Sequence, residues 1–337
     1  MNIKREHLPT PPKVLEALRK GFDAITRHII LILFPIALDL LLWFAPHLRV
    51  KQHIEHFIAD IYSLQSMYSP EFEEIMPAIQ EIWQFIAERL NILIAIRSYP
   101  VGVFSFMSSL LPVNTPLGEP VFVEFSSLGF ALLAGILLSI GGAALGGVYF
   151  SGVAQAALDD EVRWRKIFRN WPWISGQVLL LMLIWLALFT GVAVFGLCLI
   201  SGAALFSASI SQMVFLLYGA IVSWMLFPLF FSAHGIFVSK DKAWRSLKKG
   251  AQLTSMTFLK TSFFILIIIL FGQGLNMLWQ IPPENSWLML ISLLGHAFVS
   301  TGALAASFVY YNDMVQWAEK MLYLQKVYLE EEGQQIQ

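Results

Sequence analysis

The chain has very little of two things that most soluble proteins use freely, cysteine and charge. Cys198 is the only cysteine among 337 residues, so an intrachain disulfide or a thiolate metal cluster is excluded. Charged residues make up 13% of the sequence and hydrophobic residues 57%, against roughly 25% and 45–50% in an average soluble domain. This balance excludes a water-soluble globule and indicates segments that cross a bilayer.

Short motifs for catalysis and nucleotide binding are also missing. The sequence has no phosphate-binding Gly-x-x-x-x-Gly-Lys-Ser/Thr loop, no Gly-x-Ser-x-Gly elbow and no His-Glu-x-x-His pair. Ligand patterns for haem or iron–sulfur clusters do not occur either. We therefore expect a protein that is not an enzyme and has no cofactor, and nothing in the sequence supports a nucleic-acid partner.

What the sequence does have is six apolar runs long enough to cross a hydrocarbon core of roughly 30 Å. Asp39 interrupts the first run, and no small-residue cleavage site follows it, so we interpret this run as an uncleaved span. A tight Ser201-Gly202 turn is expected between the third and fourth of these runs. The six expected spans are His28–Ala45, Ser126–Ala156, Trp173–Ile200, Ala204–His234, Met256–Trp279 and Trp287–Tyr310.

Three basic amphipathic stretches each come directly before a pair of these runs. Sliding the chain by 80 positions places Trp164 on Trp244 and Arg165 on Arg245, while residues 17–21 align with residues 246–250. We therefore expect an all-α polytopic membrane protein of three related hairpins, each preceded by a basic in-plane helix. Trp and basic side chains suit the depth of anionic headgroups, although a cytoplasmic partner protein is an alternative. The contact residues would be Arg163, Trp164, Arg165, Trp244, Arg245, Lys248 and Lys249.

The distribution of lysine and arginine predicts the orientation. The N-terminus, the two inner basic stretches and the tail hold 17 of the 22 basic residues. Because positive loops stay inside, both termini are expected in the cytoplasm of a bacterial plasma membrane. The resulting division is 1–46 for the basic helix and first span, 47–125 for an extracytoplasmic helical insert, 126–311 for the other spans, and 312–337 for an amphipathic cytoplasmic tail.

Residues 47–125 are more polar than the rest and read as two helices broken at Ser69-Pro70. Apolar residues at helical spacing form a stripe on the second helix: Ile75, Ile79, Ile82, Trp83 and Ile86. The stretch Ile92–Leu111, interrupted by Arg97, Pro100 and Gly102, is expected to be a helix or hairpin that lies on the membrane surface and does not span it. His53, His56 and Asp60 share one helical face, which suits a solvated surface better than zinc because no second contributor is present.

Polar residues inside the expected spans point to a candidate site. Asp39 lies within the first span, where a carboxylate costs at least roughly 2.5–3.5 kcal/mol unless it is paired, protonated or facing water. Gln273 and Asn276 share one face of the fifth span, and His296 reaches a similar depth on the sixth. These four side chains are expected either to form structural hydrogen bonds between helices or to converge on a polar cavity. A different pattern, Gly142-x-x-x-Gly146, predicts close packing of a neighbouring helix.

The stretch KAWRSLKKGAQLTSMTFLKTSFFILIII, with Ala243, Ser246, Leu247 and Gly250 ahead of a span, resembles an element of uncharacterised six-span bacterial membrane proteins. These proteins are related to the membrane domain of glycerophosphoryl diester phosphodiesterases. The resemblance covers the spans and in-plane helices and implies a fold and a bacterial plasma membrane. The catalytic barrel of those enzymes, with its His-Arg-Gly start, is absent, so their chemistry is not implied.

The patterns leave more than one function open. The first is a non-enzymatic scaffold or accessory subunit that uses the insert and the basic helices as contact surfaces for other membrane subunits. The second is a small transporter or lipid-handling protein that uses a polar cavity near Asp39. A permease subunit is a third, but the Glu-Ala-Ala opening of its coupling segment is replaced by Asp241-Lys242-Ala243.

Overall fold

The computed structural model describes residues 9–65 and 71–335, and almost all of its regular structure is helical. Five helices in this part are long and apolar enough to cross a membrane, and a sixth candidate is the bent pair Val14–Arg27 and Ile29–Phe44. The chain is therefore a polytopic helical membrane protein. The break that the sequence predicts at Ser69-Pro70 lies outside the described residues.

The chain divides into two compact units, which are described separately. The first unit contains residues up to His28, residues 150–271 and residues from 302 onward, and the second contains residues 29–149 and 272–301. Three helices pass from one unit into the other: α6 (Leu128–Leu158), α11 (Phe258–Trp279) and α12 (Met289–Gln335). The expected last span and the expected tail are parts of one helix, α12.

The first unit is an aromatic-rich bundle. Its core includes Phe231, Phe264 and Tyr310, and the rings of Phe264 and Tyr310 stack with centroids 4.3 Å apart. Offset or parallel aromatic pairs of this kind add to the energy of burial. Besides the shared helices, the elements of this unit are α1 (Val14–Arg27), α7 (Trp164–Ala204), α8 (Ala208–Leu226), η4 (Phe227–Leu229), α9 (His234–Val238) and α10 (Ala243–Met256).

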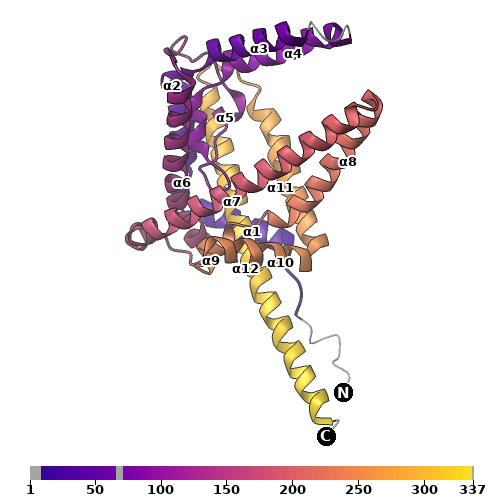
Figure 1. Ribbon diagram of the computed structural model, residues 1–337. Coiled ribbons are helices and arrows are strands. Elements are labelled where there is room, and N and C mark those ends of the chain that lie inside the picture. The colour runs from indigo at the N-terminus through magenta and orange to yellow at the C-terminus, as the bar shows by residue number, and fades with distance from the viewer. Residues whose placement is uncertain (1–8, 66–70, 336–337) are drawn as a thin grey trace. The chain divides into compact units, whose positions relative to one another are not determined.

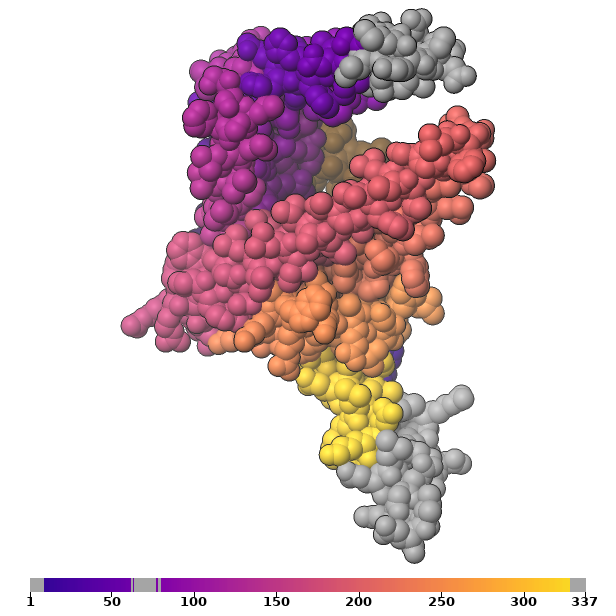
Figure 2. Space-filling model, in the orientation of Figure 1, coloured from indigo at the N-terminus to yellow at the C-terminus, as the bar shows by residue number. Residues whose placement is uncertain are grey.

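Helices α7 and α8 form a hairpin (Figures 1 and 2). Apolar side chains cover most of its surface. The Tyr218 hydroxyl donates to the Val192 carbonyl at 2.6 Å, and its ring packs on Gly196. The expected turn at Ser201-Gly202 is wrong, because α7 continues to Ala204 and the connection is 205–207. The second basic stretch is likewise the start of α7 and not a separate in-plane helix, because α7 continues through Pro172 into the span.

The second unit contains the insert. Helices α3 (Lys51–Gln65) and α4 (Glu71–Arg89) pack side by side (Figure 1), and two short parallel strands, β1 (His47–Arg49) and β2 (Phe122–Glu124), pair His47 with Phe122. Asn91 connects β1 to the chain after α4, because its side-chain oxygen accepts hydrogen bonds from the backbone of Leu48 at 3.0 Å and of Leu93 at 3.1 Å. The remaining elements are η2 (Ile29–Ile32), α2 (Leu33–Phe44), η3 (Ile92–Arg97) and α5 (Met107–Leu110).

The linker between α11 and α12 is bonded to the insert within this second unit. The Glu284 carboxylate accepts from the Val113 backbone and the Asn114 amide, each at 3.3 Å, and lies 3.6 Å from Arg89. The Trp43 indole donates to the Glu284 carbonyl at 3.0 Å. The linker and the insert are therefore on the same side of the candidate spans that they connect.

Candidate functional site

The candidate site is built around Asp39 on α2, whose side chain is completely buried. Its Oδ1 atom accepts a hydrogen bond from the Ser105 hydroxyl at 2.6 Å and another from the Met107 backbone at 3.0 Å. Ser105 lies in the chain between η3 and α5, and Met107 is the first residue of α5. The carboxyl group of Asp39 therefore holds a segment that is distant in sequence.

That segment, residues 98–106, is here called the irregular segment because it has no regular secondary structure. Val101, Val103 and Phe106 are buried in it, and the backbone of Gly102 lies against Gly146 of α6. The expected helix or hairpin on the membrane surface is wrong. Apolar residues with Pro100 and Gly102 among them predict a broken surface helix and a buried irregular chain equally well.

Two glycines of α6 make room for this chain. A Cβ atom on Gly142 would lie 1.9 Å from the carbonyl oxygen of Ile96, and one on Gly146 would lie 2.7 Å from the Cα of Gly102. The expected small-residue face is therefore present, but what packs on it here is irregular backbone and the end of a 3₁₀ helix, not a neighbouring span. Because Gly142 lies near the middle of α6, this chain reaches the middle of a candidate span.

Backbone at that depth must have its polar groups satisfied by protein, since lipid offers no partners. Asp39 accepts from the Met107 backbone and from the Ser105 hydroxyl, and that hydroxyl accepts in turn from the Ser108 backbone at 3.0 Å. Arg97 donates to the Ser108 hydroxyl at 3.0 Å. The hydrogen bonds around Asp39 therefore serve mainly to hold the irregular segment in place. No sequence pattern points directly to Ser105, because a serine within an interrupted apolar run is common.

The other three predicted site residues are placed differently. The ring of His296 on α12 packs beside Phe106 with centroids 5.4 Å apart, so it lies next to the same segment as Asp39. Asn276 on α11 is half-buried, whereas Gln273 is exposed. Gln273 does not join Asp39 among the described contacts, because its position on α11 turns it to the surface. Each of Asp39, His296 and Asn276 has a buried side-chain atom without a hydrogen-bond partner in the described part, namely Asp39 Oδ2, His296 Nδ1 and Asn276 Oδ1.

The predicted lipid-contact residues form two groups in the first unit. On α10, Trp244 is 55% exposed and the Lys248 amine lies 4.9 Å from its ring centroid, while Arg245 and Lys249 face Asp241 at 3.2 and 3.9 Å. At the start of α7, Arg163 pairs with Asp159, Trp164 stacks on Phe168, and Arg165 is exposed. Lys248 and Arg165 therefore keep the most freely available positive charge.

His53, His56 and Asp60 lie on α3. Within residues 9–65 and 71–335, no group of three or more His, Cys, Asp or Glu side chains is arranged to hold a metal ion. His56 and Asp60 are exposed, as a solvated helical face requires.

Comparison with protein-family models, with curated proteins and with solved structures finds no match for this chain. The resemblance to membrane proteins related to glycerophosphoryl diester phosphodiesterases stays a prediction.

Proposed function

We propose that the chain is a non-enzymatic membrane scaffold or accessory subunit whose helical insert contacts another component of a membrane assembly. The observation that carries this proposal is the exposed apolar side of α4. Ile82 is 59% exposed and Phe85 55% exposed, although they lie in the most polar part of the sequence. Exposed apolar groups that cluster in this way mark interaction sites. Of the predicted stripe, Ile82 and Trp83 are exposed and Ile86 is half-buried, whereas the side chains of Ile75 and Ile79 lie outside the described part. Phe85 lies beside the stripe and was not part of the prediction.

The surroundings of Asp39 favour the scaffold as well. A site that binds and releases a solute needs polar groups that face open space, but Asp39 is fully buried and bonded to the irregular segment. Its role is then to hold the fold of the second unit. The transporter alternative has one observation in its favour, namely that Asp39 Oδ2 and His296 Nδ1 are buried without partners.

We infer further that the chain crosses the membrane six times, with both termini in the cytoplasm. Residues 29–44 comprise a 3₁₀ turn and twelve helical residues, with a length of about 26 Å, close to the hydrocarbon thickness. His28, with φ −120° and ψ 49°, ends α1 ahead of this span. The bonds between Glu284 and the insert agree with a topology that puts the linker and the insert on one side.

A relation between α1 and α10 supports the proposed repeat. Both helices have 14 residues, and the alignment of residues 17–21 with 246–250 also superposes their ends. The buried positions then coincide one for one. They are Val14, Ala17, Gly21, Ala24 and Ile25 in α1, and Ala243, Ser246, Gly250, Leu253 and Thr254 in α10. The stretch at the start of α7 does not follow this pattern, so the repeat is best supported for its first and third copies.

The scaffold is tested by the size of the particle extracted from native membranes with a lipid-retaining copolymer. Wild type should be larger than a single 38.1 kDa chain in its lipid disc, and I82S/F85S should reduce it to a single chain. The matched control E81S/Q84S changes two exposed side chains at the same spacing and should leave the size unchanged. A wild type that is already a single chain, or an assembly that survives I82S/F85S, would contradict the proposal.

A further inference from the structure

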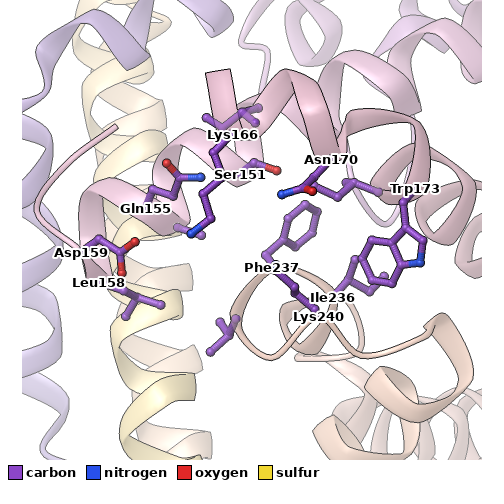
Figure 3. A pocket seen from close by; sticks show the side chains of 14 residues that line it. Ser151, Gln155, Leu158, Asp159, Lys166, Asn170, Trp173, Ile236, Phe237 and Lys240 are labelled. Carbon is purple, nitrogen blue, oxygen red and sulfur yellow. The ribbon is translucent and has the colours of Figure 1, made fainter. Parts of the chain in front are cut away.

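A cavity of about 260 Å³ lies in the first unit, among α6, α7, α9 and the chain that follows α9 (Figure 3). Its walls come from the ends of three candidate spans: the last turns of α6, the first turns of α7, and the residues around Val238 that end the span Ala208–Val238. A cavity at three span ends is at the edge of the membrane, where lipid headgroups lie.

The charges around this cavity leave an excess of positive charge. Lys166 and Lys240 line it, and within the described part neither side chain has an ion-pair or hydrogen-bond partner. One carboxylate, Asp159, also lines it, but Arg163 binds that carboxylate from outside the cavity. The backbone amide of Arg163 further occupies the Gln155 side-chain oxygen at 2.9 Å. The two lysines are therefore available for an anion.

The remaining walls are divided between hydrogen-bonding and apolar groups. In Figure 3 the Asn170 amide points toward Ser151 across the cavity, and the Lys166 side chain extends toward Gln155 and Asp159. Phe237 and Trp173 provide apolar surface next to these groups. A ligand that suits this lining has an anionic head and an apolar body.

Lys240 has a backbone conformation that is unusual for lysine. Its φ is +55°, in the left-handed region where a residue with a Cβ atom is strained by about 1–2 kcal/mol and glycine is not. Glycine would thus be the residue of choice for the turn alone. A lysine at this position is accounted for if its amine has a role in the cavity.

We propose that this cavity binds the phosphate of an anionic phospholipid headgroup. Lys166 and Lys240 neutralise the phosphate, Asn170 donates a hydrogen bond to it, and the acyl chains lie along the apolar wall next to Trp173 and Phe237. In this proposal a single lipid occupies a defined cavity. This binding differs from the diffuse attraction of anionic headgroups to exposed charges such as Arg165 or Lys248. It does not depend on whether the chain is a scaffold.

Native mass spectrometry of the full chain in detergent, titrated with phosphatidylglycerol or phosphatidylcholine, tests the proposal. We expect one tightly bound phosphatidylglycerol and weaker binding of phosphatidylcholine. K166Q and K240G should each weaken phosphatidylglycerol binding about fivefold, the effect of one basic residue near a membrane surface. K240G also removes backbone strain, so its melting temperature should not fall, which separates lost binding from lost folding.

The matched control is R165Q, which removes a neighbouring charge that does not line the cavity. It should leave the bound lipid unchanged. Equal losses in R165Q and K166Q would indicate diffuse attraction and overturn the proposal, as would unchanged binding in K166Q and K240G. A parallel titration with inorganic phosphate and glycerol phosphate identifies the source of the anion. Binding of these soluble compounds without binding of phosphatidylglycerol would overturn the assignment to a lipid.

Discussion

Asp39 is the residue at which the two candidate functions predict different outcomes. In D39L the Ser105 hydroxyl and the Met107 amide lose their buried acceptor, at about 1–3 kcal/mol for each unsatisfied group. In D39N the amide oxygen can still accept both bonds. We therefore expect the thermal stability of the purified protein to fall much further in D39L than in D39N.

The same pair of variants separates structure from transport. If Asp39 only holds the irregular segment, cells that depend on the protein should tolerate D39N and fail with D39L. If Asp39 exchanges a proton during transport, D39N should fold normally and yet lose function, because an amide does not titrate. A stable, inactive D39N would therefore contradict the structural role that we assign to Asp39.

His47 in β1 gives a pH dependence that can be measured in the insert. Burial is the main cause that lowers the pKa of its imidazole below the ordinary value of 6.5, and the nearby Arg49 charge acts in the same direction. Because the folded state resists protonation, the stability from this residue is fully present above pH 6.5 and decreases as the pH falls below that value. Hydrogen exchange at residues 47–49 and 122–124 should therefore show more frequent opening at pH 5 than at pH 7.5.

The control for this prediction is H47N, which removes the titrating group. Exchange rates in H47N, corrected for the intrinsic effect of pH, should no longer differ between pH 5 and pH 7.5. If the pH dependence persisted in H47N, the opening would depend on the titration of another group, which would contradict the prediction.

At the scale of the elements, the contact between α6 and the irregular segment can be tested with two neighbouring glycines. G142A would place a Cβ atom 1.9 Å from the Ile96 carbonyl oxygen, whereas nothing lies within 4 Å of the corresponding atom in G141A. Overpacking of this kind costs typically about 1–3 kcal/mol. We expect G142A to melt at a lower temperature than wild type in detergent, while G141A melts at the same temperature or slightly higher. Equal melting of the two variants would show that the irregular segment does not pack on α6.

The sequence predicted the helices far better than their contacts. Long apolar runs predicted the spans near the positions of α6, α8 and α11, because length and composition alone decide that a segment is long enough to cross. The prediction for residues 92–111 was wrong because their apolar residues have no period that distinguishes a surface helix from a buried irregular chain. The Gly142 and Gly146 pattern correctly indicated close approach, but a small-residue face does not say what approaches it.

The central residue of the candidate site could be predicted from the sequence, but its partners could not. An acid within an apolar run identified Asp39, since such a residue must find partners. Its partners Ser105 and Met107 were not predictable, because they come from a segment more than sixty positions away in the sequence. Gln273 shares a helical face with Asn276, but periodicity does not tell which face is buried. Nothing in the sequence brings Lys166 and Lys240 together, because only the packing of α6, α7 and the chain after α9 places them at one cavity.

At the scale of the whole molecule, the number of crossings decides where the two ends of the chain lie. Five helices are candidate spans by themselves, and the bent pair before the insert decides between five crossings and six. With either number, the insert and the linker around Glu284 share one side, and the C-terminus is on the other. Only the side of the N-terminus differs. Both termini lie on the same side if residues 29–44 cross, and on opposite sides if they do not.

Labelling with a membrane-impermeant thiol reagent in intact cells tests this central claim most directly. Cys198 is the only native cysteine, so C198S provides a background for single cysteines at Thr10, Glu119 and Lys326, all in the part of the chain that the structure describes. Six crossings predict that Glu119→Cys is labelled in intact cells, whereas Thr10→Cys and Lys326→Cys react only after permeabilisation. Labelling of Thr10→Cys together with Glu119→Cys in intact cells would contradict the account.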